Sequence, residues 1–311
     1  MNNKGLIAGC PGHLHATKFQ RKMRGGSQSS LLQAEDGKYY IVKMMGNPQG
    51  CSVLFSEALG SEIMRLIGLA TPDWRPIVIS EKFIEDNPGM WFEMPGSCAQ
   101  RPSAGLHFGS KLVMPTTNEN LFEILPRSWF AKIRNRESFL GALLFDLWAN
   151  QSDARQAVFL QDLENRSISA TFIDHGALFG QHNAGCSTKR IRAMYLDPEI
   201  YENLDVDSAL PKWEDRIATL SESTLAMLIE RADIPTQWYT PIDITKVVSR
   251  LAERRELLGG YADLIRASIK CRRADRLTES PNERLGEVRL RSAQLCTIGY
   301  RRILRAMPRV G

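Results

Sequence analysis

The chain has 311 residues, of which 43% are hydrophobic and 24% are charged, as in ordinary globular proteins. No apolar run approaches the length needed to cross a bilayer, and the N-terminus has no long apolar region of a secretory signal. The six cysteines are scattered without a Cys-x-x-Cys spacing and give no sign of a disulfide framework. We therefore expect a cytoplasmic protein with no membrane partner.

Basic residues are concentrated at the C-terminal end. The net charge is +5, but residues 271–311 carry ten arginines against four acidic residues, a net +6, so that residues 1–270 carry a net −1. A basic tail is one way to contact nucleic acid or an acidic partner. We favour a solvated helical extension with ion pairs between neighbouring turns. Outside this tail we expect no nucleic-acid partner, because no helix-turn-helix pattern is evident.

The predicted elements begin after an irregular N-terminus, residues 1–16. Three strands follow, joined by short turns: Thr17–Arg24, Ser29–Ala34 and Lys38–Met45. The turn between the first two strands contains Gly25, Gly26 and Ser27. A glycine-rich connection exposes backbone N–H groups that can bind phosphates, although the same residues also form ordinary hairpin turns.

Lys43 lies in the middle of the third strand, after the glycine-rich turn, where kinases place the lysine that contacts nucleotide phosphates. A solvent-facing lysine on an edge strand is the alternative. Residues 52–68 then show the apolar spacing of an amphipathic helix. Of its two acids, Glu57 and Glu62, we choose Glu57 as the partner that orients Lys43 by an ion pair.

The rest of the chain predicts the end of a first lobe and a mostly helical second lobe. Residues 77–79 continue the sheet, residues 85–105 predict an excursion loop, and Lys111–Pro115 predicts the last strand before a hinge. Three helical regions follow: Arg136–Trp148, Ser208–Ile234 and Ile242–Ala267. The predicted fold class is α+β, a two-lobed protein-kinase-like fold with a small antiparallel sheet in the N-lobe (17–114) and a mostly helical C-lobe (115–270).

Two carboxylates mark the centre of the chain. Asp153 follows a long apolar helix and begins a polar Asp-Ala-Arg-Gln segment, and Asp174 ends a short apolar strand in Phe-Ile-Asp-His-Gly. A kinase-like fold uses one such carboxylate to accept the proton of the acceptor hydroxyl and the other to hold magnesium against the nucleotide phosphates. We expect the two to converge on one cleft facing Lys43, with Gly176 letting the chain turn after Asp174.

Four motifs in this order carry a family resemblance: KYYIVKMMGNPQG, the pair Ser56-Glu57, Asn150 with Asp153-Ala-Arg-Gln, and Phe-Ile-Asp-His-Gly. Together they resemble the HipA-like kinase family, bacterial proteins with a two-lobed kinase-like fold that are distantly similar to protein kinases and phosphatidylinositol kinases. The resemblance covers roughly residues 17–265. It implies a kinase that depends on ATP and Mg²⁺. Family members best known as toxins phosphorylate a protein serine, and some phosphorylate a serine in their own glycine-rich loop.

The resemblance also implies roles for four residues. Lys43 would contact the nucleotide phosphates, with Glu57 as its partner. Asp153 would be the catalytic-loop aspartate, and Asp174 would bind the metal in a triplet that has His175 where kinases have Phe.

One position departs from the kinase pattern. Kinases usually place a metal-binding Asn five residues after the catalytic Asp, and here that position is Val158. Gln156 and Asn150 are the alternative metal ligands, since each carries an amide oxygen near Asp153. The departure puts the second metal site in question.

Three neighbouring side chains have competing interpretations. Arg155 either binds the transferred phosphate bidentately or ties down the loop by an ion pair. His175 either titrates near its usual pKa of about 6.5 or packs against the aspartate and orients it. Asp146 is expected to be a buried hydrogen-bonding acid or a cap.

Three functions are compatible with these features. The first is a serine/threonine protein kinase, for which the resemblance implies a protein substrate and allows a separate antitoxin-like partner chain. The second is a small-molecule kinase, and the third is a pseudokinase that works as a binding module, which Val158 favours. Ser27, Ser29 and Ser30 are candidate sites of self-phosphorylation, in or beside the glycine-rich turn.

Overall fold

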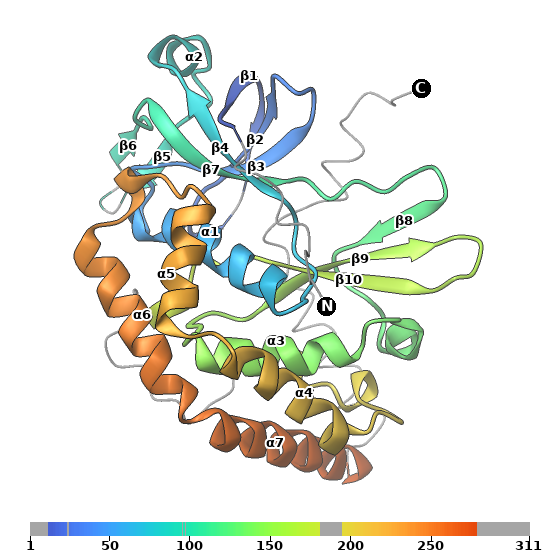
Figure 1. Cartoon of the computed structure of the whole chain (residues 1–311). Coiled ribbons are helices and arrows are strands. Elements are labelled where there is room, and N and C mark those ends of the chain that lie inside the picture. Colours follow the sequence, from blue (N-terminus) through green and yellow to red (C-terminus); the bar gives the residue numbers. More distant parts are fainter. Residues whose placement is uncertain (1–11, 24, 95, 97, 181–194, 279–311) are drawn as a thin grey trace, which may run out of the picture.

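The computed structural model shows two lobes, as predicted for an α+β chain of this kind (Figure 1). It describes residues 12–23, 25–94, 96, 98–180 and 195–278. A strand-rich N-lobe lies above a mostly helical C-lobe, and helix α1 lies between them. The predicted basic extension, residues 271–311, lies outside the described residues from residue 279 onward, and so do residues 1–11 of the expected irregular N-terminus.

The N-lobe is built on five strands that close into a barrel in the order β1-β2-β3-β7-β4. Their bounds are Leu14–Lys22 for β1, Ser30–Ala34 for β2, Tyr39–Lys43 for β3, Trp74–Ile79 for β4 and Gly105–Lys111 for β7. Neighbours pair antiparallel except β1 and β4, which are parallel, so the predicted antiparallel sheet closes on itself. Inward-facing side chains such as Leu32, Tyr40, Val42 and Ile77 fill the barrel.

Two predicted strand boundaries were wrong. The first strand begins at Leu14, inside the region expected to be irregular, because Leu14 and His15 pair with β4. The last strand of the lobe ends at Lys111 instead of beginning there. Its residues pair with both β3 and β4, and this cross-barrel pairing decides the position of the strand more than local composition does.

The predicted helix of the N-lobe is present as α1, Ser52–Leu66. The expected excursion loop, residues 85–105, contains regular structure instead: the end of helix α2 (Glu81–Asp86) and a small hairpin of β5 (Phe92–Met94) and β6 (Cys98–Gln100). Ser80 caps α2 by accepting a hydrogen bond from the N–H of Phe83. A short helix with a serine cap is a weak signal beside the prolines and glycines that surround it.

The C-lobe combines a three-stranded antiparallel sheet with five helices in the part of the chain that the structure describes. The sheet has the order β10-β9-β8, with β8 at Glu119–Phe122, β9 at Gln156–Asp162 and β10 at Ile168–Ile173. The helices are α3 (Glu137–Trp148), α4 (Val206–Ala218), α5 (Glu222–Arg231), α6 (Pro241–Arg255) and α7 (Leu258–Thr278). Short 3₁₀ turns are η1 (Arg127–Lys132), η2 (Leu178–Gly180), η3 (Pro198–Ile200) and η4 (Thr236–Trp238).

The two lobes share one apolar core. It runs from α1 through α3 to the helices α4–α7. At the junction the rings of Phe55 and Tyr239 lie 5.1 Å apart, and the indole N–H of Trp238 donates to the carbonyl of Leu106 on β7 at 3.0 Å. This packing fixes α1, and the side chains it carries, against the C-lobe.

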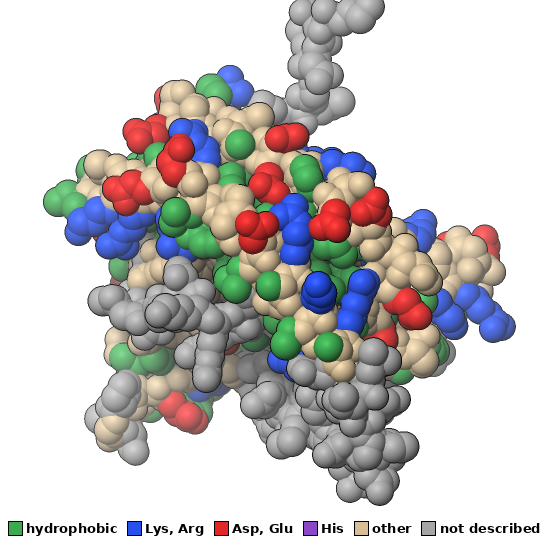
Figure 2. Space-filling view, turned by 90° about the horizontal axis from the view of Figure 1, so that it is seen from below, with side chains coloured by type: hydrophobic (Ala, Val, Ile, Leu, Met, Phe, Trp, Pro, Cys, Tyr) green, Lys and Arg blue, Asp and Glu red, His purple; other side chains and the backbone are tan. Residues whose placement is uncertain are grey.

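One face of the molecule carries charged side chains of both signs. On the face seen from below, Lys and Arg side chains lie among Asp and Glu side chains (Figure 2). Within the described residues, no helix combines the length and apolarity required to span a membrane.

Candidate active site

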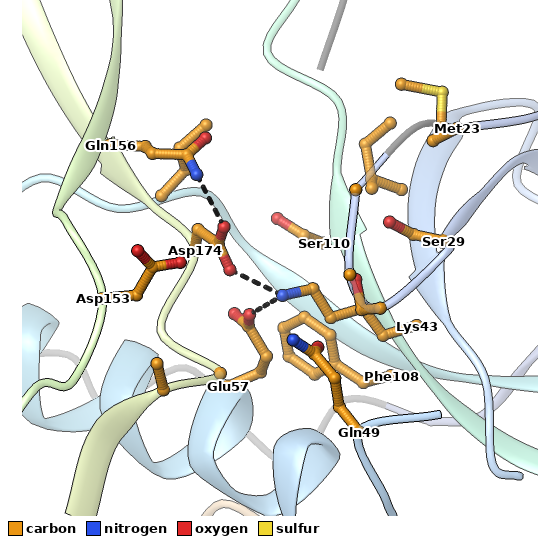
Figure 3. A pocket seen from close by; sticks show the side chains of 17 residues that line it. Met23, Ser29, Lys43, Gln49, Glu57, Phe108, Ser110, Asp153, Gln156 and Asp174 are labelled. Carbon is orange, nitrogen blue, oxygen red and sulfur yellow. Dashed lines mark hydrogen bonds and ion pairs between the residues drawn. The ribbon is translucent and has the colours of Figure 1, made fainter. Parts of the chain in front are cut away.

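One cavity lies between the lobes and collects most of the side chains that the sequence analysis selected (Figure 3). The empty space within it is about 920 Å³, and part of that space is open to solvent. The N-lobe contributes the glycine-rich turn and the inward ends of β3, β7 and α1. The C-lobe contributes the loop after α3, the start of β9 and the loop after β10. The predicted residues that line it are Gly25, Gly26, Ser27, Lys43, Glu57, Asp153, Gln156 and Asp174.

Lys43 lies between two carboxylates. Its Nζ donates to Asp174 Oδ1 at 2.7 Å and makes a very short contact with Glu57 Oε1. Glu57 Oε2 accepts from the backbone N–H of His175 at 3.0 Å, so this one side chain joins β3, α1 and the loop after β10. The expected pairing of Glu57 with Lys43 is therefore present. Glu62, the alternative acid, instead bonds Arg65 and the indole of Trp74.

The electrostatics of this triad follow from its burial. Burial alone would lower the pKa of Lys43, but the carboxylates of Asp174 and Glu57 raise it above its ordinary value. Burial opposes ionisation of Asp174, yet the Lys43 ammonium dominates and lowers the pKa of Asp174 to about 2. Burial raises the pKa of Glu57, and Lys43 opposes that shift. Lys43 is thus a fixed cation, and Asp174 is ionised at neutral pH.

Gly176 makes the triad sterically possible. A Cβ at this position would lie 2.8 Å from Val53 Cγ1, 3.1 Å from Glu57 Oε1 and 3.2 Å from Lys43 Nζ. The glycine therefore provides close approach, not the turn that we expected of it. The turn itself is made by Asp174, whose φ is 64°, a left-handed conformation that Asp adopts more readily than most residues.

Arg155 is a structural residue, and its predicted contact with the transferred phosphate is wrong. Its side chain is 1% exposed and pairs with Asp146 of α3. Its Nη1 donates to the carbonyls of Ile173 (3.2 Å) and Asp174 (3.1 Å) and to His175 Nδ1 (2.6 Å). The guanidinium is buried among these acceptors and is not part of the cavity wall, so it does not face a ligand. Of its two interpretations, tying down the loop is the correct one.

His175 is a neutral, buried side chain that orients its neighbours. Because Arg155 can only donate, His175 Nδ1 must be an acceptor, and Nε2–H then donates to Thr71 Oγ1 at 2.8 Å. Burial, together with the Arg155 charge, lowers the pKa of His175 well below its ordinary value. Burial raises the pKa of Asp146, against the effect of Arg155. These groups hold the backbone on both sides of Asp174.

Asp153 lies at the open side of the same cavity. It is exposed, and its Oδ1 accepts from the N–H of Ala154 at 2.7 Å. The loop is held by the preceding residue, since both the N–H and the hydroxyl of Ser152 donate to the carbonyl of Ala177. Asp153 and Asp174 therefore share one cavity with Lys43, as predicted from the sequence.

The three amide or apolar positions considered for a second metal behave differently. Gln156 lines the cavity and its Nε2 donates to Asp174 Oδ2 at 2.9 Å, so it presents nitrogen and not the predicted oxygen. Val158 is 1% exposed in an apolar cluster. Asn150 is not part of the cavity wall: it ends α3 in a Schellman motif, with φ 54°, and its amide packs against Gly180. Its prediction as a metal ligand was wrong.

The glycine-rich turn covers the cavity. The N–H of Met23 donates to Ser29 O at 2.7 Å and closes the turn, and a second bond runs from the N–H of Gln28 to Gly25 O. The Gln28 amide bonds both backbone groups of Glu93, which ties the turn to the β5–β6 hairpin. Ser27 and Ser29 line the cavity. Ser30 is 1% exposed within β2, so it is a poor candidate for self-modification.

Sequence reasoning missed the apolar wall and two polar groups of the cavity: Met23, Ile41, Phe108, Ile173, Gln49 and Ser110. Because side chains alternate between the two faces of a strand, some of these residues could have been predicted from the sequence. Ile41 lies two residues before Lys43 and so shares its face of β3. Phe108 gave no such signal, because its partner Lys43 lies on a strand far away in sequence.

The donor set suits a magnesium ion that is shared with phosphates. Among the described residues there is no cluster of three or more His, Cys, Asp or Glu side chains that could hold a metal alone. Mg²⁺ is commonly held by one or two carboxylates together with substrate phosphates. Asp174, partly exposed to the cavity beside Lys43, provides such a carboxylate.

Comparison with known proteins gives structural neighbours only. No family model and no curated protein matches the sequence. The Golgi casein kinase solved with Mn/ADP bound is 11% identical with a TM-score of 0.48, over 85% of this chain and 74% of that one. The Helicobacter pylori proinflammatory kinase CtkA is 12% identical with a TM-score of 0.47, over 80% of this chain and 97% of that one. At these values the chemistry has to be argued from the site itself.

Proposed function

We propose that the protein is an ATP- and Mg²⁺-dependent phosphotransferase, a HipA-like serine/threonine protein kinase. The observation that carries the proposal is Lys43, which contacts Glu57 and Asp174 inside a cavity that also contains Asp153. A lysine paired with a helix glutamate, and two aspartates on separate loops, are the parts that phosphoryl transfer requires.

The cavity offers surfaces that suit the base and the phosphates of ATP. The apolar side chains of Met23, Ile41 and Phe108 provide a wall for the base. The backbone of the glycine-rich turn and the Lys43 ammonium provide the donors for phosphate oxygens. Asp174 would hold the magnesium ion, which neutralises the charge that develops on the phosphates.

Asp153 would position the acceptor hydroxyl and accept its proton. It is exposed on the open side of the cavity, while Asp174 is bound by two donors and cannot serve as a base. An alcohol group of a protein serine or threonine is the acceptor that the family resemblance implies. A separate antitoxin-like partner chain is part of the same proposal.

The test compares variants that separate binding from transfer. Asp174→Asn should lose Mg²⁺-dependent protection by ATP in a thermal-unfolding assay. Asp153→Asn should keep that protection but transfer labelled phosphate to lysate proteins roughly 10²–10⁴-fold more slowly, as expected when a positioned base is removed. Asp86→Asn, a change at an exposed acid of α2, is the matched control.

The possible outcomes test the proposed residue roles and distinguish the three functions. An undiminished transfer rate in Asp153→Asn or Lys43→Ala would disprove the proposed roles. Labelling of a small molecule in place of lysate proteins would indicate the small-molecule kinase. ATP protection without any transfer would indicate a pseudokinase, the third function, which the buried Val158 favours.

Self-phosphorylation is expected at Ser27 or Ser29, which line the cavity. A phosphate there adds nearly two negative charges beside the ATP phosphates and should weaken nucleotide binding. Mass spectrometry after incubation with ATP checks this, and an unmodified turn in an enzyme active on other substrates would contradict it.

A further inference from the structure

We infer that this site holds a single divalent cation, because Gln156 donates an amide N–H to Asp174 instead of offering an oxygen to a second cation. Protein kinases hold two magnesium ions, one through the aspartate equivalent to Asp174 and one through a catalytic-loop Asn. The inference rests on the proposed function and concerns the composition of its metal site.

The two oxygens of Asp174 are already engaged. Lys43 Nζ donates to Oδ1 at 2.7 Å, and Gln156 Nε2 donates to Oδ2 at 2.9 Å (Figure 3). An ionised carboxylate only accepts hydrogen bonds, so the Gln156 amide must face it with nitrogen. The partial positive charge of that N–H repels a cation from Oδ2. The remaining lone pairs of the carboxylate serve one ion.

The residue that would supply the second set of oxygens is absent. Gln156 and Val158 lie on one face of β9, opposite Ile173 and Thr171 of β10. Val158 is 1% exposed and packs in an apolar cluster with Met23 and Ile173. A metal ligand at this position is replaced by a buried side chain without oxygen.

The other oxygens near the triad are committed elsewhere. Both Glu57 oxygens are bonded, one to Lys43 and one to the N–H of His175. The amide of Asn150 lies against Gly180, away from the cavity. Asp153 faces the open side, where the acceptor hydroxyl would enter. Among the described cavity residues, Asp174 is thus the carboxylate available to a cation beside Lys43.

The experiment measures Mn²⁺ bound per protein in the presence of a saturating non-hydrolysable ATP analogue, by electron paramagnetic resonance of free Mn²⁺. We expect one Mn²⁺ per complex for the wild type. Gln156→Glu replaces the N–H donor by a carboxylate oxygen and should raise the number to two. Gln33→Glu, which adds the same charge on β2 outside the cavity wall, should stay at one.

The outcomes separate this inference from the proposed function. Two Mn²⁺ in the wild-type complex would overturn the inference and leave the kinase proposal standing. One Mn²⁺ in a folded Gln156→Glu complex would overturn the blocking role of the amide. No analogue-dependent Mn²⁺ binding by the wild type would overturn the proposed function itself. The wild-type number decides the cation count even if a variant fails to fold.

Discussion

Removing the Arg155 guanidinium is the sharpest test of how the active-site loop is held. Arg155→Met keeps an extended apolar side chain but leaves Asp146 without its ion-pair partner. It also frees the carbonyls of Ile173 and Asp174 and the Nδ1 atom of His175. All of these groups surround the backbone that presents Asp174 to the cavity.

The size of the expected stability loss follows from the burial of both side chains. Arg155 is 1% exposed and the Asp146 side chain 11%, so the abandoned carboxylate cannot be rehydrated easily. Breaking a buried ion pair on one side costs about 3–5 kcal/mol, because an uncompensated charge remains. Replacing both partners by apolar groups is often close to neutral. We therefore expect Arg155→Met to cost about 3–5 kcal/mol of unfolding free energy and the double variant with Asp146→Leu to cost clearly less.

Urea unfolding at pH 7.5, followed by circular dichroism, measures these differences. Arg250→Met, a change at an exposed arginine of α6, is the control and should stay within about 0.5 kcal/mol of the wild type. A loss below about 1 kcal/mol for Arg155→Met would refute the reasoning. The reasoning would also be refuted if the stability loss of the double variant equalled the sum of the losses of the two single variants, because Arg155 and Asp146 would then not be coupled.

Two further predictions concern Gly176 and His107. Gly176→Ala places a methyl group 3.1 Å from Glu57 Oε1 and 3.2 Å from Lys43 Nζ. We therefore expect the unfolding free energy to fall by about 1–3 kcal/mol and ATP binding, measured by calorimetry, to weaken. An unchanged ATP affinity would contradict this expectation. Burial lowers the pKa of His107 to about 4. Between pH 6.5 and pH 4 the native state therefore binds fewer protons than the unfolded chain. Over this range the unfolding free energy should fall as the pH falls, by up to about 1.4 kcal/mol per pH unit. The His107→Asn side chain can still accept a hydrogen bond from the N–H of Met45. In urea titrations at pH 7, 6 and 5 its unfolding free energy should lose the pH dependence that His107 causes. An unchanged pH dependence in this variant would contradict the role given to His107.

The sequence was informative where local pattern and chemistry agree. Lys43 in a β pattern, Glu57 one turn into an amphipathic helix and Asp174 after an apolar strand each stand where the structure has them. Their convergence also followed from the sequence, because each lies at the end or edge of an element that a two-lobed fold brings together. The two-lobed α+β arrangement was predicted on the same grounds and is observed.

What failed depended on tertiary partners that no local pattern contains. Arg155 is compatible with a phosphate ligand until Asp146 and His175 are found around it. The start of β1 at Leu14 depends on pairing with a strand some sixty residues away. Asn150 is different, because an Asn directly after an apolar helix is a recognisable helix-ending signal that could have been used.

The charges in the cavity explain why one divalent cation is enough and why it is needed. Lys43 offsets one of the two carboxylates it contacts, and Asp153 adds a further negative charge at the open side. A nucleotide polyphosphate entering such a cavity meets Lys43 and the N–H groups of the glycine-rich turn, but it also meets Asp174. A cation shared between Asp174 and the phosphates turns that repulsion into attraction. Among the described residues that contact Lys43, a second cation would find no further free carboxylate, since both Glu57 oxygens are bonded and the Gln156 amide donates to the remaining oxygen of Asp174. Val158, at the position where kinases usually have Asn, therefore fits a site whose charge is balanced by one ion. The hydrogen bond from the Gln156 amide to Asp174 takes the place of a second ion.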